Sequence, residues 1–147
     1  GHLFAAGRAG ERFAVRNSGA KVVIEGCGSN GCEYMTGGVA VILGSIGANF
    51  GAGMTGGMAY VYDPDGKAQD LMNLETLVTC SVSVSHWEAQ LKGLVMRHAE
   101  ETGSRKAAEI LLHWDMEKQN FLQICPKEML GKLAHPLTRE SEAMPAE

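Results

Sequence analysis

Residues 28–43 read GSNGCEYMTGGVAVIL, and residues 47–62 read GANFGAGMTGGMAYVY. The offset between these two stretches is 19 residues, and seven positions are identical, with the shared Met-Thr-Gly-Gly as the strongest match. A fainter copy lies one period upstream, where residues 19–24 align with residues 38–43. A fixed period of about 20 residues is typical of a solenoid, in which each repeat is one coil and neighbouring coils bury each other's faces.

The apolar runs of the repeat, residues 22–24, 41–43 and 60–62, are β-branched, aliphatic and aromatic. These residue types favour strands, and a Gly-Gly pair interrupts both clear copies before a helix could form. A leucine-rich repeat would need regularly spaced leucines, whereas residues 28–63 contain only Leu43. The pattern therefore predicts a mainly β fold, a parallel β-helix of 19-residue coils stacked at the ordinary strand spacing of about 4.8 Å.

The period also predicts which side chains point into the coil. Three columns contain no charged residue, and strand alternation places them inside: 20/39/58, 22/41/60 and 24/43/62. The column of Val23, Ile42 and Val61 then points outward, although it is wholly aliphatic. An exposed apolar strip usually marks a contact surface. We therefore expect another part of the chain, or a partner domain, to cover this strip.

From Ser85 onward the apolar spacing changes from that of strands to that of helices. Ser85 and Glu88 fit a capping box, Gly103 fits a helix stop, and Ser104 fits the cap of a second helix. The residues expected on the buried faces are Trp87, Leu91, Leu94, Val95 and His98 in the first helix, then Ala107, Ile110, Leu111 and Trp114 in the second. This pattern predicts a helical hairpin that caps the solenoid.

The end of the chain is expected to be extended at residues 121–125, followed by a short helix that Pro126 opens. The last residues are polar and are expected to be disordered. The expected organisation is thus a parallel β-helix at residues 1–84, a helical C-terminal cap at residues 85–134, and a disordered tail at residues 135–147.

Composition excludes several classes of function. The formal net charge is -4 and positive charge is scattered, so there is no basic surface for nucleic acid. No apolar run approaches the roughly 18 residues that cross a membrane, and the first residues lack the pattern of a signal peptide. Scattered cysteines without a C-x-x-C pair favour a reducing compartment: Cys27, Cys32, Cys80 and Cys125. We expect a cytoplasmic protein without nucleic-acid or membrane partners.

Residues 26–31, GCGSNG, match the G-x-G-x-x-G fingerprint of dinucleotide-binding proteins and follow an expected strand. The chemistry of that fingerprint needs a helix immediately afterwards, because the helix N-terminus holds the pyrophosphate. Residues 32–38 instead lead to another Gly-Gly pair. The repeat explains the same glycines, so a dinucleotide site is the weaker interpretation.

Other candidate site residues have structural interpretations that are stronger than their functional ones. Cys27 and Cys32 resemble part of an iron–sulfur ligand run, but no further cysteine follows at short range. His98 lies on the apolar face of its helix, while His113 and Asp115 flank a tryptophan without an accompanying nucleophile. We therefore predict no catalytic, cofactor-binding or metal-binding residue in this chain.

Two pairs of identical residues fall in register one period apart. Asn30 and Asn49 are expected to exchange side-chain amide hydrogen bonds between coils. Met35 and Met54 are expected to fill gaps in the core rather than to bind a cofactor.

Four segments together resemble the C-terminal G-x-G-x-G domain of the large (alpha) subunit of glutamate synthase: residues 10–19 (GERFAVRNSG), 23–28 (VIEGCG), 31–38 (GCEYMTGG) and 49–57 (NFGAGMTGG). Residues 102–114 and 121–126 are similar to the helical tail of the same family. The resemblance implies a right-handed β-helix without its own active site, packed against other domains. It also implies a parent enzyme that converts glutamine and 2-oxoglutarate into two glutamates.

The resemblance places the FMN and the iron–sulfur cluster of that enzyme in other domains, so no cofactor is expected in this chain. The expected function is a non-catalytic scaffold that positions the glutaminase and FMN domains, with other domains or subunits of glutamate synthase as partners. Because the first residue is glycine, the chain is expected to be processed or cut from a larger polypeptide. The alternatives are a stand-alone β-helix subunit of a related oxidoreductase complex and an autonomous enzyme that binds a small molecule.

Overall fold

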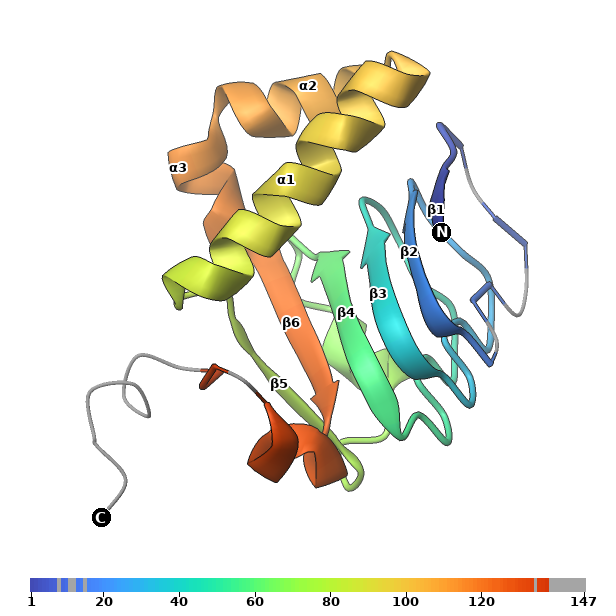
Figure 1. Cartoon of the computed structure of the whole chain (residues 1–147). Helices are drawn as coiled ribbons and strands as arrows, with labels where there is room; N and C mark the ends of the chain where they lie inside the picture. The colour runs from blue at the N-terminus through green and yellow to red at the C-terminus, as the bar shows by residue number, and fades with distance from the viewer. Residues whose placement is uncertain (8, 11–12, 15, 134, 138–147) are drawn as a thin grey trace.

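The fold was analysed on a computed structural model that describes residues 1–7, 9–10, 13–14, 16–133 and 135–137. Within these residues, six strands form one sheet in the order β1-β2-β3-β4-β6-β5, and helices cover one face of it (Figure 1). The strands are β1 (His2–Phe4), β2 (Ser18–Ile24), β3 (Thr36–Ile42), β4 (Gly56–Tyr62), β5 (Leu77–Ser81) and β6 (Phe121–Pro126). The helices are α1 (Ser85–Thr102), α2 (Arg105–Leu112) and α3 (Trp114–Glu117), with 3-10 turns η1 (Ala68–Leu71), η2 (Lys118–Asn120) and η3 (Lys127–Lys132).

The repeat forms the parallel half of the sheet. Strands β1 to β4 pair in parallel and in chain order, so that Ala40 of β3 lies beside Val22 on one side and Ala59 on the other. Strand β6 then pairs antiparallel with both β4 and β5. In Figure 1, β6 therefore lies between two strands that come long before it in the chain.

The prediction of a mainly β, right-handed parallel β-helix is wrong. The structure is mixed α/β, and its single six-stranded mixed sheet stays open, with β1 at one edge and β5 at the other. The segment that returns from β2 to β3 consists of turns, since Asn30, Cys32 and Tyr34 have positive φ of 62°, 58° and 56°. A left-handed backbone interrupts an extended chain. Each repeat therefore contributes one strand, and β6 rather than another coil continues the sheet.

The prediction that successive copies of the repeat lie against each other is confirmed by their backbone hydrogen bonds. Thr55 N donates to Met35 O at 2.9 Å, which joins the two Met-Thr-Gly-Gly segments. In the turns, Asn30 N donates to Ala48 O at 2.8 Å, and Tyr34 N donates to Ala52 O at 2.8 Å. The stacking therefore includes the turn segments as well as the strands.

The expected columns of inward-facing residues are displaced by a change of register. The pairing between β2 and β3 shifts between Ser18 and Lys21, so that Val22 lies beside Ala40 and not beside Val41. A shift of one residue moves a side chain to the other face of the sheet. Val22 therefore packs on the face that meets the turns, whereas Val41 packs against the helices.

The aliphatic strip that was expected to point outward does not exist as one column. Val23 packs on the helix side of the sheet, whereas Ile42 and Val61 pack on the side of the turns. All three are buried, as expected, but they are covered by opposite layers of the same chain. Both faces of this sheet are thus core, which is why its strands are apolar at consecutive positions.

The prediction of the first helix is confirmed, and that of the second is confirmed in part: Ala107, Ile110 and Trp114 are buried, but Leu111 is only half-buried, and α2 ends at Leu112 so that Trp114 begins α3. All five residues expected on the inner face of α1 are buried, and Gly103 ends the helix with φ of 69°. Ser104 caps α2 by accepting a hydrogen bond from Ala107 N at 3.1 Å. The capping box at Ser85 is wrong, because Val84 is the N-cap residue and no side chain caps the helix.

The C-terminal segment also follows the expectation in part. The extended run is strand β6, and the helix after Pro126 is the 3-10 turn η3. Of the tail that was expected to be disordered, residues 135–137 are described, while residue 134 and residues 138–147 lie outside the described part. No helix in the described ranges combines the length and the apolar composition that a membrane crossing requires.

Candidate functional site

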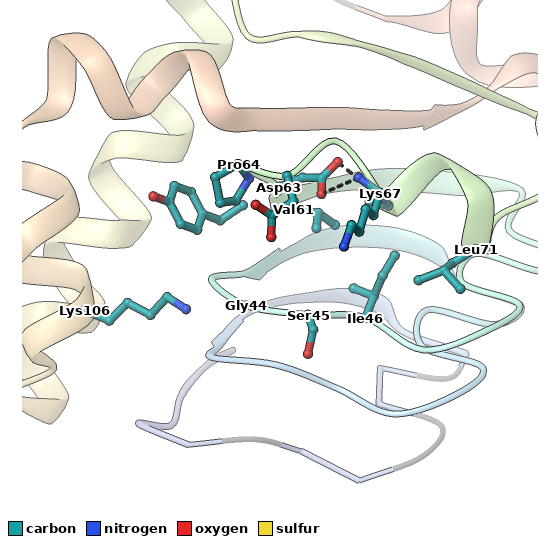
Figure 2. A pocket seen from close by; sticks show the side chains of 12 residues that line it. Gly44, Ser45, Ile46, Val61, Asp63, Pro64, Lys67, Leu71 and Lys106 are labelled. Atoms are coloured by element: carbon teal, nitrogen blue, oxygen red, sulfur yellow. Dashed lines mark hydrogen bonds between the residues drawn. The ribbon is translucent and has the colours of Figure 1, made fainter.

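A hollow of about 340 Å³ lies where the parallel strands end. Gly44 follows β3 and Asp63 follows β4 at its wall, and Ile46, Val61 and Leu71 provide apolar contacts (Figure 2). The carboxyl ends of parallel strands are the usual location of ligand sites in open α/β sheets. This edge of the sheet is therefore a candidate ligand site.

Two lysines approach this hollow from different elements. Lys106 extends from α2, and its Nζ lies 5.7 Å from the centre of the Tyr62 ring. Lys67 opens the turn before η1, where its backbone N–H and that of Ala68 donate to the carboxylate of Asp63 at 3.0 and 3.1 Å. Asp63 is thereby fixed by the backbone, and this edge of the hollow carries both signs of charge.

Tyr62 is not a base at neutral pH. Burial and its hydrogen bond to the Glu117 carboxylate raise the pKa of Tyr62 to about 12. The hydroxyl therefore stays protonated and donates to Glu117, which ties the end of β4 to α3. Its role in this geometry is structural.

Next to the hollow, a carboxylate and an imidazole join the sheet to the helices. Glu25 follows β2, and its Oε2 lies 2.9 Å from Nε2 of His98 on α1. His98 is fully buried and Glu25 is 19% exposed. Burial opposes ionisation of Glu25, but hydrogen bonds from His98 and Ser104 outweigh it, so the pKa of the Glu25 carboxyl is lowered. The sequence correctly predicted a packed His98 but gave no sign of its partner, which is 73 positions away.

The G-x-G-x-x-G segment does not form a nucleotide-binding turn. After Gly31 the chain continues in turns as far as Tyr34 and then enters β3. No helix N-terminus follows in this described segment, so the group that would hold a pyrophosphate is missing from it. Gly31 instead lies inside the stack, where an added Cβ would be 2.9 Å from Cys27 Sγ and 3.1 Å from the Phe50 ring.

The two cysteines of this segment do not fit an iron–sulfur cluster. Cys27 and Cys32 are both fully buried. Burial and the neighbouring Cys27 thiol raise the pKa of the Cys32 thiol, whereas iron is bound by thiolates. Within the described ranges, no three His, Cys, Asp or Glu side chains are grouped so that they could hold a metal ion.

The remaining candidates are explained by backbone geometry and packing. Asn30 and Asn49 share a left-handed conformation, with φ of 62° and 59°, which asparagine adopts more readily than most residues. Met35 and Met54 are buried in the core of the turns, as predicted. His113 is exposed at the junction of α2 and α3. At the hollow, Asp63, Lys67 and Lys106 provide charges of both signs that can hold a polar group. Among the described residues there, no acid and nucleophile are arranged as a pair.

Comparison with known proteins adds family information to this geometry. The GXGXG motif family matches residues 1–127. The glutamate synthase (NADPH) large chain of Azospirillum brasilense is 62% identical over 137 residues, which are 93% of this chain and 9% of that protein. Ferredoxin-dependent glutamate synthase 2 of Synechocystis is 52% identical over 126 residues, 86% of this chain and 8% of that protein. The glutamate synthase (NADPH) large chain of Bacillus subtilis is 47% identical over 135 residues, 91% of this chain and 9% of that protein.

The chain therefore spans less than a tenth of the length of these relatives. The resemblance to the G-x-G-x-G domain of the glutamate synthase large subunit, drawn from residues 10–19, 23–28, 31–38 and 49–57, is confirmed. Since the matched residues include the whole repeat, α1, α2 and strand β6, the chain belongs to the GXGXG motif family.

Proposed function

We propose that this chain is a non-catalytic scaffold segment of a glutamate synthase-type enzyme, which forms glutamate from glutamine and 2-oxoglutarate. In this proposal it positions a glutaminase domain relative to an FMN domain. The observation that carries it is the high similarity of nearly the whole chain to a small part of much longer glutamate synthase chains. That the reported relatives are glutamate synthases favours this function over a subunit of another oxidoreductase complex.

The stacked repeat supports a mechanical role. Hydrogen bonds join each turn to the next, and close backbone contacts leave little space between them. At Gly44, for example, an added Cβ would be 2.2 Å from Glu25 O. A stiff element that holds two reactive domains in one orientation lowers the entropic cost of transfer between them. The proposal places FMN and the iron–sulfur cluster in other domains, with no ligand from this chain, and places the enzyme in the cytoplasm.

Two assays test this function. The isolated 147-residue chain is expected to turn over neither glutamine nor 2-oxoglutarate, and turnover by the isolated chain would defeat the proposal. The second assay uses a complete glutamate synthase large chain that carries this segment. There, Gly38→Ala is compared with Gly19→Ala, because an added Cβ is crowded at Gly38 and meets open space at Gly19.

We expect Gly38→Ala to lower the glutamate formed per glutamine hydrolysed and to increase the ammonia that escapes, while Gly19→Ala leaves both unchanged. Hydrogen exchange of the segment must show that Gly38→Ala has loosened the stack. If the stack is loosened and the ratio of glutamate to hydrolysed glutamine stays that of the parent protein, the segment does not position the catalytic domains.

A further inference from the structure

The hollow at the carboxyl ends of β3 and β4 combines an apolar floor with a charged rim. Ile46, Val61 and Leu71 supply the apolar floor (Figure 2). The volume of about 340 Å³ lies within the range of small-molecule sites, which begins at roughly 300 Å³. A ligand that matches this hollow is therefore small, with an apolar part for the floor and charged groups for the rim.

The half-buried cation of the rim has no partner for its ammonium group. Lys106 reaches the hollow from α2, where its Nζ lies 5.7 Å from the centre of the Tyr62 ring. The ammonium acts on the Glu25 carboxylate through its charge, but among the described residues it makes neither an ion pair nor a hydrogen bond. Its N–H donors are thus available to an anionic group in the hollow.

The two aspartates of the rim differ in how far their carboxylates are already used. Both oxygens of Asp63 accept hydrogen bonds, from the backbone N–H groups of Lys67 and Ala68 at 3.0 and 3.1 Å. Asp65 is exposed in the same turn, and its carboxylate makes no hydrogen bond or ion pair with any residue that the structure describes. Asp65 is therefore the rim carboxylate that can receive a cationic group.

The charges of the rim balance, and this balance selects the type of ligand. Lys67 and Lys106 are cationic, while Asp63 and Asp65 are anionic. A simple anion is attracted by the lysines but repelled by the aspartates, and the reverse holds for a simple cation. A zwitterion gains at both of its charges. An α-amino acid with an aliphatic side chain has both charges at one end and an apolar group at the other, which matches the rim and the floor.

We propose that this hollow is a binding site for a free α-amino acid with an aliphatic side chain. Lys106 receives its carboxylate, Asp65 receives its ammonium, and the apolar floor receives its side chain. Because Lys106 lies on α2 and Asp65 follows β4, the bound amino acid also joins the helices to the sheet. Exposed ion pairs are individually modest, so the expected affinity is in the millimolar range. The scaffold role proposed above needs no ligand here, so the two proposals stand independently.

The first test compares three compounds on the 147-residue chain, followed through the methyl resonances of Ile46, which an Ile46→Val variant assigns. L-leucine carries both charges, 4-methylpentanoate lacks the ammonium, and 3-methylbutylamine lacks the carboxylate, while all three share the same branched apolar end. We expect L-leucine to shift the Ile46 resonances with an affinity about fivefold or more above that of either analogue. Equal affinities for the three compounds would overturn the proposal, and so would the absence of any shift with L-leucine.

The second test removes one charge of the rim at a time. Lys106→Gln should lower the affinity for L-leucine to about that of 3-methylbutylamine, and should leave the affinity for 3-methylbutylamine unchanged. Asp65→Asn should lower the affinity for L-leucine to about that of 4-methylpentanoate. Lys92→Gln on α1 is the matched control, because it removes the same charge outside the hollow and should leave all three affinities unchanged.

If Lys106→Gln or Asp65→Asn binds L-leucine as tightly as the parent chain does, the proposal is overturned. The comparison of the three compounds uses the parent chain, so it decides the proposal even where a variant fails to fold.

Discussion

His98 Nε2 lies 2.9 Å from Glu25 Oε2, so the buried middle of α1 is tied to the end of β2. The pair lies between the sheet and the helices, with the Ser104 hydroxyl and the Lys106 ammonium also acting on the carboxylate. A buried charged group is stabilising only while its partners remain in place. The packing of the helices on the sheet should therefore depend on the charge of Glu25.

Removing that charge gives the first prediction. Glu25→Gln should lower the free energy of unfolding at pH 7 by about 2 kcal/mol, the usual value for hydrogen bonds to a charged group. The pKa of Glu25 in the folded chain is lowered below its ordinary value of 4.5, so the stabilisation is complete above that pH and is lost as pH falls through the folded pKa. The difference between the parent chain and the variant should shrink below pH 4.5.

Urea unfolding between pH 7 and pH 3 measures this difference, and Glu100→Gln on the exposed face of α1 is the control for loss of a carboxylate. An undiminished difference at pH 3 would show that the ionised form of Glu25 is not the stabilising one.

Close stacking of the repeat gives the second prediction. Gly38 has φ of 83°, and an added Cβ would be 2.3 Å from Ala20 O and 2.8 Å from Asn17 Nδ2. Asn17 holds the turn before β2 by accepting from Ala20 N at 2.9 Å. Gly38→Ala should therefore lower the free energy of unfolding by at least about 2 kcal/mol, because the backbone is strained and this turn is displaced.

The matched control is Gly19→Ala, where the added Cβ meets no atom within 4 Å and should change stability by less than about 0.5 kcal/mol. Thermal or urea unfolding of both variants measures the contrast. Equal stabilities would mean that the two strands are not in the close contact described above.

The helices could be predicted from the sequence because their signal is local. Apolar residues at helical spacing identify the buried face of α1 directly, and a glycine marks its end. The exact repeat likewise predicted that its copies lie against each other. Pairings between distant segments left no such signal: His98 meets Glu25, and β6 pairs with β4 and β5.

The errors in the facing of the strands and in the fold class have equally specific causes. A fixed 19-residue period cannot reveal the register shift between Ser18 and Lys21, which moved the β2 residue of each expected column to the other face of the sheet. The turns between strands were hinted at by Gly51 and Gly53, which have φ of 72° and 67°. Their counterparts one period earlier are Cys32 and Tyr34, residue types that give no indication of a left-handed backbone.

The two serines at helix starts give the third prediction. Ser104 caps α2 through Ala107 N, whereas Ser85 lies inside the first turn of α1 without capping it. Ser104→Ala should lower the free energy of unfolding by about 1 kcal/mol, and Ser85→Ala should lower it by less than about 0.5 kcal/mol. Amide exchange at Ala107 should rise in the first variant alone. Equal losses of stability in the two variants would contradict the assignment of the cap. Ser104→Thr retains a hydroxyl cap, so it should recover most of the free energy of unfolding that Ser104→Ala loses.

The core between the sheet and the stacked turns gives the last prediction. Phe50 is fully buried there, with its ring next to Gly31, and its backbone N–H donates to Leu71 O at 3.0 Å. Phe50→Ala leaves a cavity where rigid turns cannot collapse, so the free energy of unfolding should fall by about 3–5 kcal/mol.

Leu112→Ala on α2 is the control for loss of a large apolar side chain, since Leu112 is 78% exposed and its truncation should cost less than about 0.5 kcal/mol. Urea unfolding measures both costs. Hydrogen exchange should then rise first in residues 28–35 and 47–54, because these turns pack directly around the ring. A loss below about 1 kcal/mol in Phe50→Ala would mean that the turns are loosely packed, and a loosely packed stack could not hold two attached domains in a fixed orientation.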